Sequence, residues 1–310
     1  PDGSLPPGAF DSLGMGGVTR VVLDGTSLEK RSANLVLAGT VVNCAGGPSP
    51  WGWLSCEETT EPGHGWVFAC PTDAESAIEA APIRAYGRFR HEAVAVDPET
   101  RIAYLTEDET DSCLYRFVPH AAERDPFDGQ FFAMTVRGRA RLELGRGLSI
   151  GERLEIGWVP VADGTTSDDP VRASAQRAGA ALFRRGEGIA YHPGERGPEL
   201  VVCATAGGPV GAGQIFRLRP EGDGGELELI TQSDDTDELD MPDNVTVSPR
   251  GHVFFCEDGP GRNHLRGLDP RDGSVFDFAR NVLSGSELAG VCFSPDGRAE
   301  GPELLARWFR

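Results

Sequence analysis

Residues 43–59, NCAGGPSPWGWLSCEET, bring together residue types that can bind a metal ion. Cys56 is followed directly by two acids, Glu57 and Glu58. A thiolate beside two carboxylates is unfavourable unless the anions stay solvated, take up protons or bind a cation. The segment is therefore the first candidate for a metal site.

A second set of acids occurs at equivalent positions of a repeated unit. Each unit reads as a strand, a proline-containing turn and a second strand, as in HEAVAVDPETRIAYLTEDE and DNVTVSPRGHVFFCEDG. The units align on their turn prolines, which are Pro98, Pro193, Pro249 and Pro295. The residues six positions before these prolines are Glu92, Glu187, Asp243 and Ala289. Three of the four equivalent positions therefore carry a carboxylate at the start of an apolar strand.

The spacing of the repeats indicates how these acids are positioned. The aligned prolines are 95, 56 and 46 residues apart, and propeller blades repeat every ~40–50 residues, so the first interval fits two blades. Hairpins at this spacing predict an all-β fold, a single β-propeller of about six blades that spans residues 1–310. Residues 170–186 depart from the pattern and predict one short helical insertion. Because RAEGPELLARWFR follows the last turn, the last blade is expected to be incomplete or atypical.

A propeller would bring the equivalent acids together, because the first strand of each blade lines the central channel. Carboxylates near one axis repel strongly at low dielectric constant, and a multivalent cation would relieve that repulsion. The alternative is that the acids only cap the turns at which the strands begin, with Asp243 in an Asx-turn. Three acids in register, together with Cys56 and its neighbours, favour a metal site.

The ligand types restrict the choice of metal. Carboxylates and an amide, from Asn43 or Asn244, suit Ca²⁺ or Mg²⁺. Cys56 is a soft ligand and indicates iron, zinc or another transition metal, so a mixed site with more than one ion would satisfy both. Glu257 and Asp258 end the second strand of their unit and are further candidate ligands.

Arg185 is the candidate for binding an anionic substrate. It lies two residues before Glu187 in a protein with a formal net charge of -19. An arginine beside a group of metal-binding carboxylates is suited to phosphate or carboxylate recognition. The alternative is a solvated helix face, which is the prediction for Arg184.

The composition excludes several classes of protein. The acidic charge argues against a nucleic-acid partner, and no stretch approaches the ~18–20 apolar residues of a membrane span. Seven cysteines without a CxxC pair indicate neither a disulfide scaffold nor a zinc knuckle. Four of them adjoin apolar runs and are predicted to be small buried hydrophobic residues: Cys44, Cys113, Cys203 and Cys292.

With these residues in view, the chain resembles the PhoX-type alkaline phosphatase family, a group of bacterial β-propellers. The matching motifs are NCAGGPSPWGWLSCEE, GRFRHEAVAVD, RRGEGIAYHP, MPDNVTVSPRGHVFFCEDG and LAGVCFSPDG. They occur in the family's order and span most of the chain. The first of them is the most specific.

The resemblance implies a phosphomonoesterase with a mixed iron and calcium (Ca²⁺) centre in the propeller channel. It implies that Cys56 is the thiolate ligand of iron, that Glu57, Glu92 and Glu187 are further ligands, and that Arg185 contacts the phosphate of a small ester substrate. It also implies a periplasmic or secreted protein. The chain shows no targeting segment, so a cytoplasmic location stays open, and we expect a monomer.

Two other functions are compatible with these residues. Calcium-dependent propeller lactonases also gather Glu, Asn and Asp around a channel ion but need no cysteine ligand, so Cys56→Ser would discriminate between the two reactions. A non-catalytic propeller would use calcium only to stabilise the channel and would bind a partner at its rim.

Overall fold

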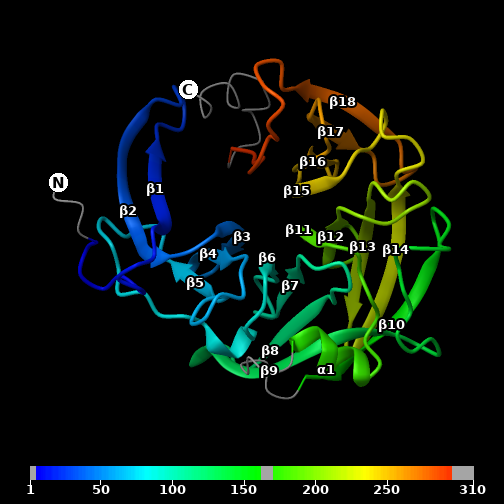
Figure 1. Ribbon diagram of the computed structural model, residues 1–310, viewed down its shortest axis with the longest axis horizontal. Coiled ribbons are helices and arrows are strands. Elements are labelled where there is room, and N and C mark those ends of the chain that lie inside the picture. Colours follow the sequence, from blue (N-terminus) through cyan, green and yellow to red (C-terminus); the bar gives the residue numbers. More distant parts are fainter. Residues whose placement is uncertain (1–4, 162–169, 295–310) are drawn as a thin grey trace.

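The computed structural model describes residues 5–161 and 170–294. Its regular structure is almost entirely β-strand, and the sheets surround a central axis as the blades of a propeller do (Figure 1). This confirms the predicted all-β propeller. One strand from each of four blades lies nearest to the axis, and we call these the inner strands: β3 (Asn43–Ser49), β6 (His91–Val96), β11 (Gly186–His192) and β15 (Pro242–Val247).

The blades follow the chain order and are antiparallel. β1 (Gly16–Leu23) and β2 (Lys30–Thr40) form a two-stranded sheet, and β3 continues into β4 (Gly52–Glu57) and β5 (Val67–Cys70). A short 3-10 helix, Arg84–Tyr86, precedes the next blade. That blade consists of β6, β7 (Ala103–Glu107), β8 (Tyr115–Ala121) and β9 (Asp125–Val136).

Two blades are joined into one nine-stranded sheet. β11 is followed by β12 (Glu199–Ala204), β13 (Gln214–Glu221) and β14 (Gly224–Gln232). The intervening strand β10 (Arg153–Pro160) pairs with both β9 and β14, the outer strands of the two neighbouring blades. The blade that begins with β15 is a separate sheet, completed by β16 (Val253–Glu257), β17 (His264–Leu268) and β18 (Val275–Arg280).

The core consists of apolar layers between successive blades. Because successive side chains of a strand point to opposite faces, Val94 of β6 packs towards β4 and Ala93 packs towards β11 and β12. A third layer contains Val201 of β12 and Phe255 of β16. Around the axis the inner strands border a cavity of about 830 Å³, lined mainly by small and apolar residues.

The predicted helical insertion is present but short. Helix α1 spans Val171–Arg177 and buries Val171 and Ala175, as the spacing predicted. The helix ends at Arg177 and is capped by Ala178, because Gly179 follows with a φ of 102°, a left-handed conformation that favours glycine. Leu182 lies beyond the helix and forms an isolated bridge with Glu143.

The last repeat differs from the others. Residues 288–294 form no strand, although Leu288 is buried against the blade of β15–β18. The unusual segment after Pro295 lies outside the described residues, so the expectation of an incomplete last blade stays a prediction. Within the described residues, no helix is long and apolar enough to cross a membrane.

Candidate metal centre

The same β-bulge occurs near the start of all four inner strands. In β6, His91 pairs with Glu107 and the next pair is Val94 with Leu105. Two residues of β6, Glu92 and Ala93, therefore lie opposite the single residue Thr106. The other inner strands have the same register shift, between Asn43 and Gly46, between Gly186 and Ile189, and between Pro242 and Val245. Bulges redirect side chains and are common beside functional sites.

The first residue of each bulge carries a possible metal ligand. These residues are Cys44, Glu92, Glu187 and Asp243. The three acids are those that the aligned repeats predicted, and the structure brings them together. Cys44 occupies the equivalent position in β3; the sequence predicted a small buried residue there, and this was wrong, because Cys44 is exposed. Its Sγ atom lies 3.3 Å from Oε1 of Glu92.

Among the described residues, three overlapping groups could each hold a metal ion. The possible ligand atoms of each group lie within 4.8 Å of one another. Glu92 belongs to two groups and Asp243 to two, so the groups form one continuous constellation. They are Cys44–Glu58–Glu92, Glu92–Glu187–Asp243 and Asp243–Asp258–Glu287.

The pKa values in this constellation are those of carboxyls that are buried close to one another. Burial and the neighbouring Asp243 carboxylate raise the pKa of Glu92 well above its usual value. Burial, followed by the charges of Glu92 and Asp243, raises the pKa of Glu187 to about 11. Burial and Glu287 raise the pKa of Asp243 to about 7. The surroundings of each carboxyl therefore disfavour its ionised form, and a bound cation would reverse this effect.

The donor set fits a mixed metal centre. A thiol and carboxylates surround one end of the constellation, and carboxylates alone surround the rest. Burial and the nearby Glu92 carboxylate also raise the pKa of Cys44, so its thiolate would need a cation as partner. The thiol end suits iron or zinc, and the carboxylate groups suit Ca²⁺.

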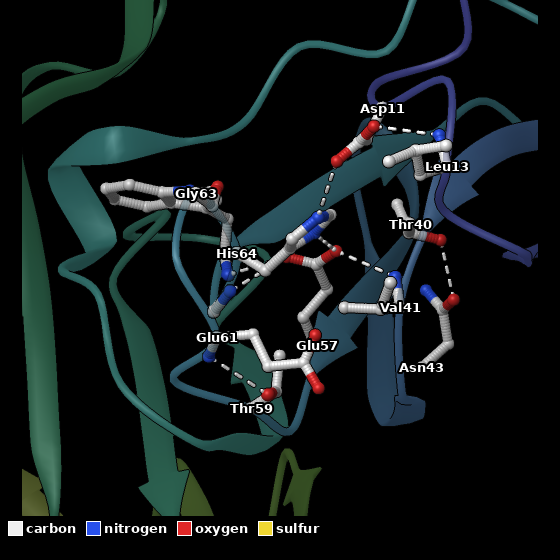
Figure 2. Close-up of polar contacts among 12 residues, drawn as sticks. Asp11, Leu13, Thr40, Val41, Asn43, Glu57, Thr59, Glu61, Gly63 and His64 are labelled. Atoms are coloured by element: carbon white, nitrogen blue, oxygen red, sulfur yellow. Dashed lines mark hydrogen bonds and ion pairs between the residues drawn. The ribbon is translucent and has the colours of Figure 1, made fainter.

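Cys56 and Glu57 lie outside these groups. Cys56 is fully buried in the apolar layer that contains Val67 and Tyr86, opposite the bulge of β3. Glu57 points to the other side of the blade, where Figure 2 shows its carboxylate beside His64. It accepts hydrogen bonds from His64 Nδ1 at 2.8 Å and from three backbone N–H groups, those of Val41, Gly65 and Trp66. Glu57 is therefore a structural hydrogen-bond acceptor, and it is the next residue, Glu58, that belongs to a candidate ligand group.

Glu257, which ends β16 in the blade β15–β18, has the same structural role as Glu57. It accepts hydrogen bonds from Arg266 Nε at 2.9 Å and from His264 Nδ1 at 3.0 Å. Asp258, the next residue, belongs to the third group. Asn244 is also engaged within the protein, because its amide donates to Asp243 at 2.9 Å and accepts from Gly290 N at 2.7 Å.

Two arginines lie beside the constellation. Arg185 Nε donates to Asp108 Oδ1 at 2.8 Å, and its Nη2 donates to Glu187 Oε1 at 3.0 Å. Arg90 Nη2 donates to Glu58 Oε1 at 2.8 Å and lies 4.0 Å from Asp108 Oδ2. Asp108 therefore connects the two guanidinium groups. Arg185 was predicted from its spacing to Glu187, whereas Arg90 was not. Arg184, the predicted surface residue, pairs with Glu143.

Glu58 belongs to the motif that suggested a metal site but was not selected as a ligand, although its position in the repeat could have indicated it. Glu58, Asp108 and Asp258 each follow the glutamate that ends the second strand of a blade. The preceding glutamates, Glu57, Glu107 and Glu257, are buried and accept hydrogen bonds within the protein. Glu287 precedes the last repeat in a segment without strand structure, and no sequence pattern indicated it.

The structure is a β-propeller with candidate metal ligands near the starts of its inner strands. The sequence model of the family described as Alkaline phosphatase PhoX matches residues 24–300, and the chain belongs to this family. No curated protein matches the chain.

Solved structures resemble the chain in fold. The structure of Pseudomonas fluorescens PhoX in complex with vanadate, a transition state analogue, has a TM-score of 0.64 and 20% identity, and the match covers 94% of this chain and 67% of that one. A putative 6-phosphogluconolactonase from Bacteroides uniformis has a TM-score of 0.46 and 13% identity, over 91% of this chain and 82% of that one.

Proposed function

We propose that the chain hydrolyses phosphate monoesters at a polynuclear metal centre on the propeller axis. The observation that carries this proposal is the placement of Arg90 and Arg185 beside three overlapping ligand groups. Membership of the PhoX family supports the phosphatase reaction. The substrate would be a small anionic phosphate ester, and export to the periplasm or medium is a proposal that follows from the family alone.

The proposed ligand set differs from the one expected from the motif. We assign the thiolate ligand to Cys44 and the adjoining carboxylate to Glu58, with Glu92, Glu187 and Asp243 continuing the centre and Asp258 and Glu287 at its far end. Iron is the proposed ion at the thiol group, and Ca²⁺ is the proposed ion at the carboxylate groups. The bound ions would supply positive charge that neutralises the phosphoryl oxygens.

Arg185 and Arg90 would orient the phosphoryl group. Asp108 fixes the Arg185 guanidinium through two hydrogen bonds, of 2.8 and 3.2 Å, so little side-chain entropy remains to be lost on binding. Both arginines present planar donors that match phosphate oxygens. Because the site is fixed before the substrate arrives, charge that develops in the transition state meets donors already in place.

The first experiment measures hydrolysis of an aryl phosphate monoester at mildly alkaline pH, with added Ca²⁺ and with chelator. We expect turnover that requires the metal and returns when Ca²⁺ is restored. Folded, metal-loaded protein without turnover would contradict the phosphatase proposal. A calcium-dependent rise in melting temperature without turnover of any ester would instead support the non-catalytic propeller, for which the all-carboxylate group Asp243–Asp258–Glu287 is the favouring observation.

Replacing Arg185 by methionine should lower kcat/KM for an aryl phosphate by roughly 100-fold, the usual effect of removing one preorganised donor. Arg90→Met should act in the same direction. Arg146→Met is the matched control, because the Arg146 side chain is 76% exposed and lies 3.8 Å from Glu143 in a surface ion pair. Equal kcat/KM values for Arg185→Met and Arg146→Met would remove Arg185 from the substrate site.

A further inference from the structure

The hydroxyl group of Thr106 connects two of the bulges that carry candidate ligands. Thr106 lies on β7 opposite the bulge of β6 and is 1% exposed. Its Oγ1 accepts a hydrogen bond from Ala93 N at 3.1 Å and donates one to the backbone oxygen of Glu187 at 2.6 Å. One hydroxyl thus contacts the peptide that follows Glu92 and the peptide of Glu187, across the boundary between two blades.

This position has a different residue type in the other blades. The residues opposite the equivalent bulges are Cys56, Cys203 and Cys256. A thiol is a weaker hydrogen-bond donor and acceptor than a hydroxyl. Among the four described bulges, only the one in β6 faces a hydroxyl group, that of Thr106. This is the bulge that carries Glu92.

A related contact joins the next pair of blades. Thr205, two residues after Cys203, donates from Oγ1 to the backbone oxygen of Pro242 at 2.9 Å. Pro242 directly precedes Asp243. The inner strands approach closely here, since a side-chain carbon on Gly188 would lie 2.5 Å from the backbone oxygen of Asp243. At both blade boundaries, a buried threonine binds the backbone beside a candidate ligand.

We propose that Thr106 is a positioning residue that fixes the separation of Glu92 and Glu187 before a metal binds. The inference rests on the metal centre of the proposed function. Without a cation, no attraction between the two carboxyls sets the distance between the starts of β6 and β11, and the charged forms of the carboxyls would repel. The hydroxyl fixes both backbones instead, so the ligands do not have to be gathered by the ion itself. Supporting contacts of this kind typically change metal affinity by 10–100-fold when removed.

The test is calorimetric titration of metal-free protein with Ca²⁺. Thr106→Val keeps the shape of the side chain and removes both hydrogen bonds, and we expect Ca²⁺ affinity to fall at least about tenfold. Thr106→Ser keeps the hydroxyl and should restore most of the affinity. Thr231→Val, at a buried threonine of the outer strand β14, is the matched control and should leave the affinity unchanged.

The outcomes separate this inference from the function on which it rests. If the wild type binds Ca²⁺ and Thr106→Val binds it equally well, the positioning role is refuted while the metal centre stands, even if the variant melts at a lower temperature. If the wild type does not bind Ca²⁺, both proposals fail. If Ca²⁺ binds but no phosphate ester is hydrolysed, the phosphatase proposal alone fails. Should Thr106→Val not fold, Thr106→Cys, which installs the residue of the other blades, decides by the same titration.

Discussion

Glu92→Gln should remove most of the activity of the proposed centre. Glu92 is shared by the thiol group and by the central carboxylate group, so its loss weakens two ion sites together. Because changes outside the ligand set already cost 10–100-fold, we expect the loss of a shared ligand to lower aryl phosphatase activity by more than about 100-fold. Metal analysis of the purified variant should show that both its iron content and its Ca²⁺ content are reduced.

The same substitution should stabilise the chelated protein. Glu92 is 1% exposed, and glutamine keeps its shape without an acid that must be desolvated. We expect the melting temperature in chelator to rise by a few degrees, while that of the metal-loaded protein falls. Glu99 is an exposed acid on the turn of the same hairpin, and Glu99→Gln should leave the melting temperatures of the chelated and the metal-loaded protein unchanged. An active, metal-replete Glu92→Gln variant would remove Glu92 from the ligand set.

Cys44→Ser should affect metal content and activity, whereas Cys56→Ser should affect stability. Cys44→Ser should lower the iron content and reduce phosphatase activity by more than about tenfold, because a hydroxyl is a poor ligand for the ion that a thiolate selects. Cys56→Ser should leave the metal content unchanged and lower the free energy of unfolding by about 1–3 kcal/mol, since it places a hydroxyl in an apolar layer. Metal analysis and denaturant unfolding of both variants measure the two effects.

The reverse result would restore the assignment made from the motif. If Cys56→Ser lost iron and Cys44→Ser retained it, the thiolate ligand would be Cys56 and the blade would have to rearrange when metal binds. The lactonase alternative predicts that neither serine variant loses activity, because that reaction needs no thiolate.

The sequence repeat predicted those candidate ligands that occupy equivalent positions in successive blades. Glu92, Glu187 and Asp243 could be found because each lies at the same distance from a turn proline, and equivalent positions of a propeller meet at its axis. The same reasoning identified Arg185 through its spacing to Glu187. The all-β architecture followed from hairpins whose spacing matches blades.

The choice between neighbouring residues could not be made from spacing. In a strand, a shift of one residue moves a side chain to the opposite face, and a bulge changes the alternation at the point where the ligands lie. Cys56 and Glu57 are adjacent to Glu58 in sequence, yet Cys56 enters the core and Glu57 binds His64. Cys44 was not proposed as a ligand from the sequence, because its place among the candidate ligands depends on a bulge that leaves no mark in the composition.

The candidate ligands lie in sheets that differ in their resistance to local opening. Glu92 and Glu187 belong to blades that β10 joins through continuous backbone hydrogen bonds, so they open together as one cooperative unit. Cys44 and Asp243 come from separate sheets on either side of this unit. Fluctuation of either flanking sheet leaves the central pair of carboxyls in place. An ion held by that pair would therefore exchange more slowly than ions at the two ends of the constellation.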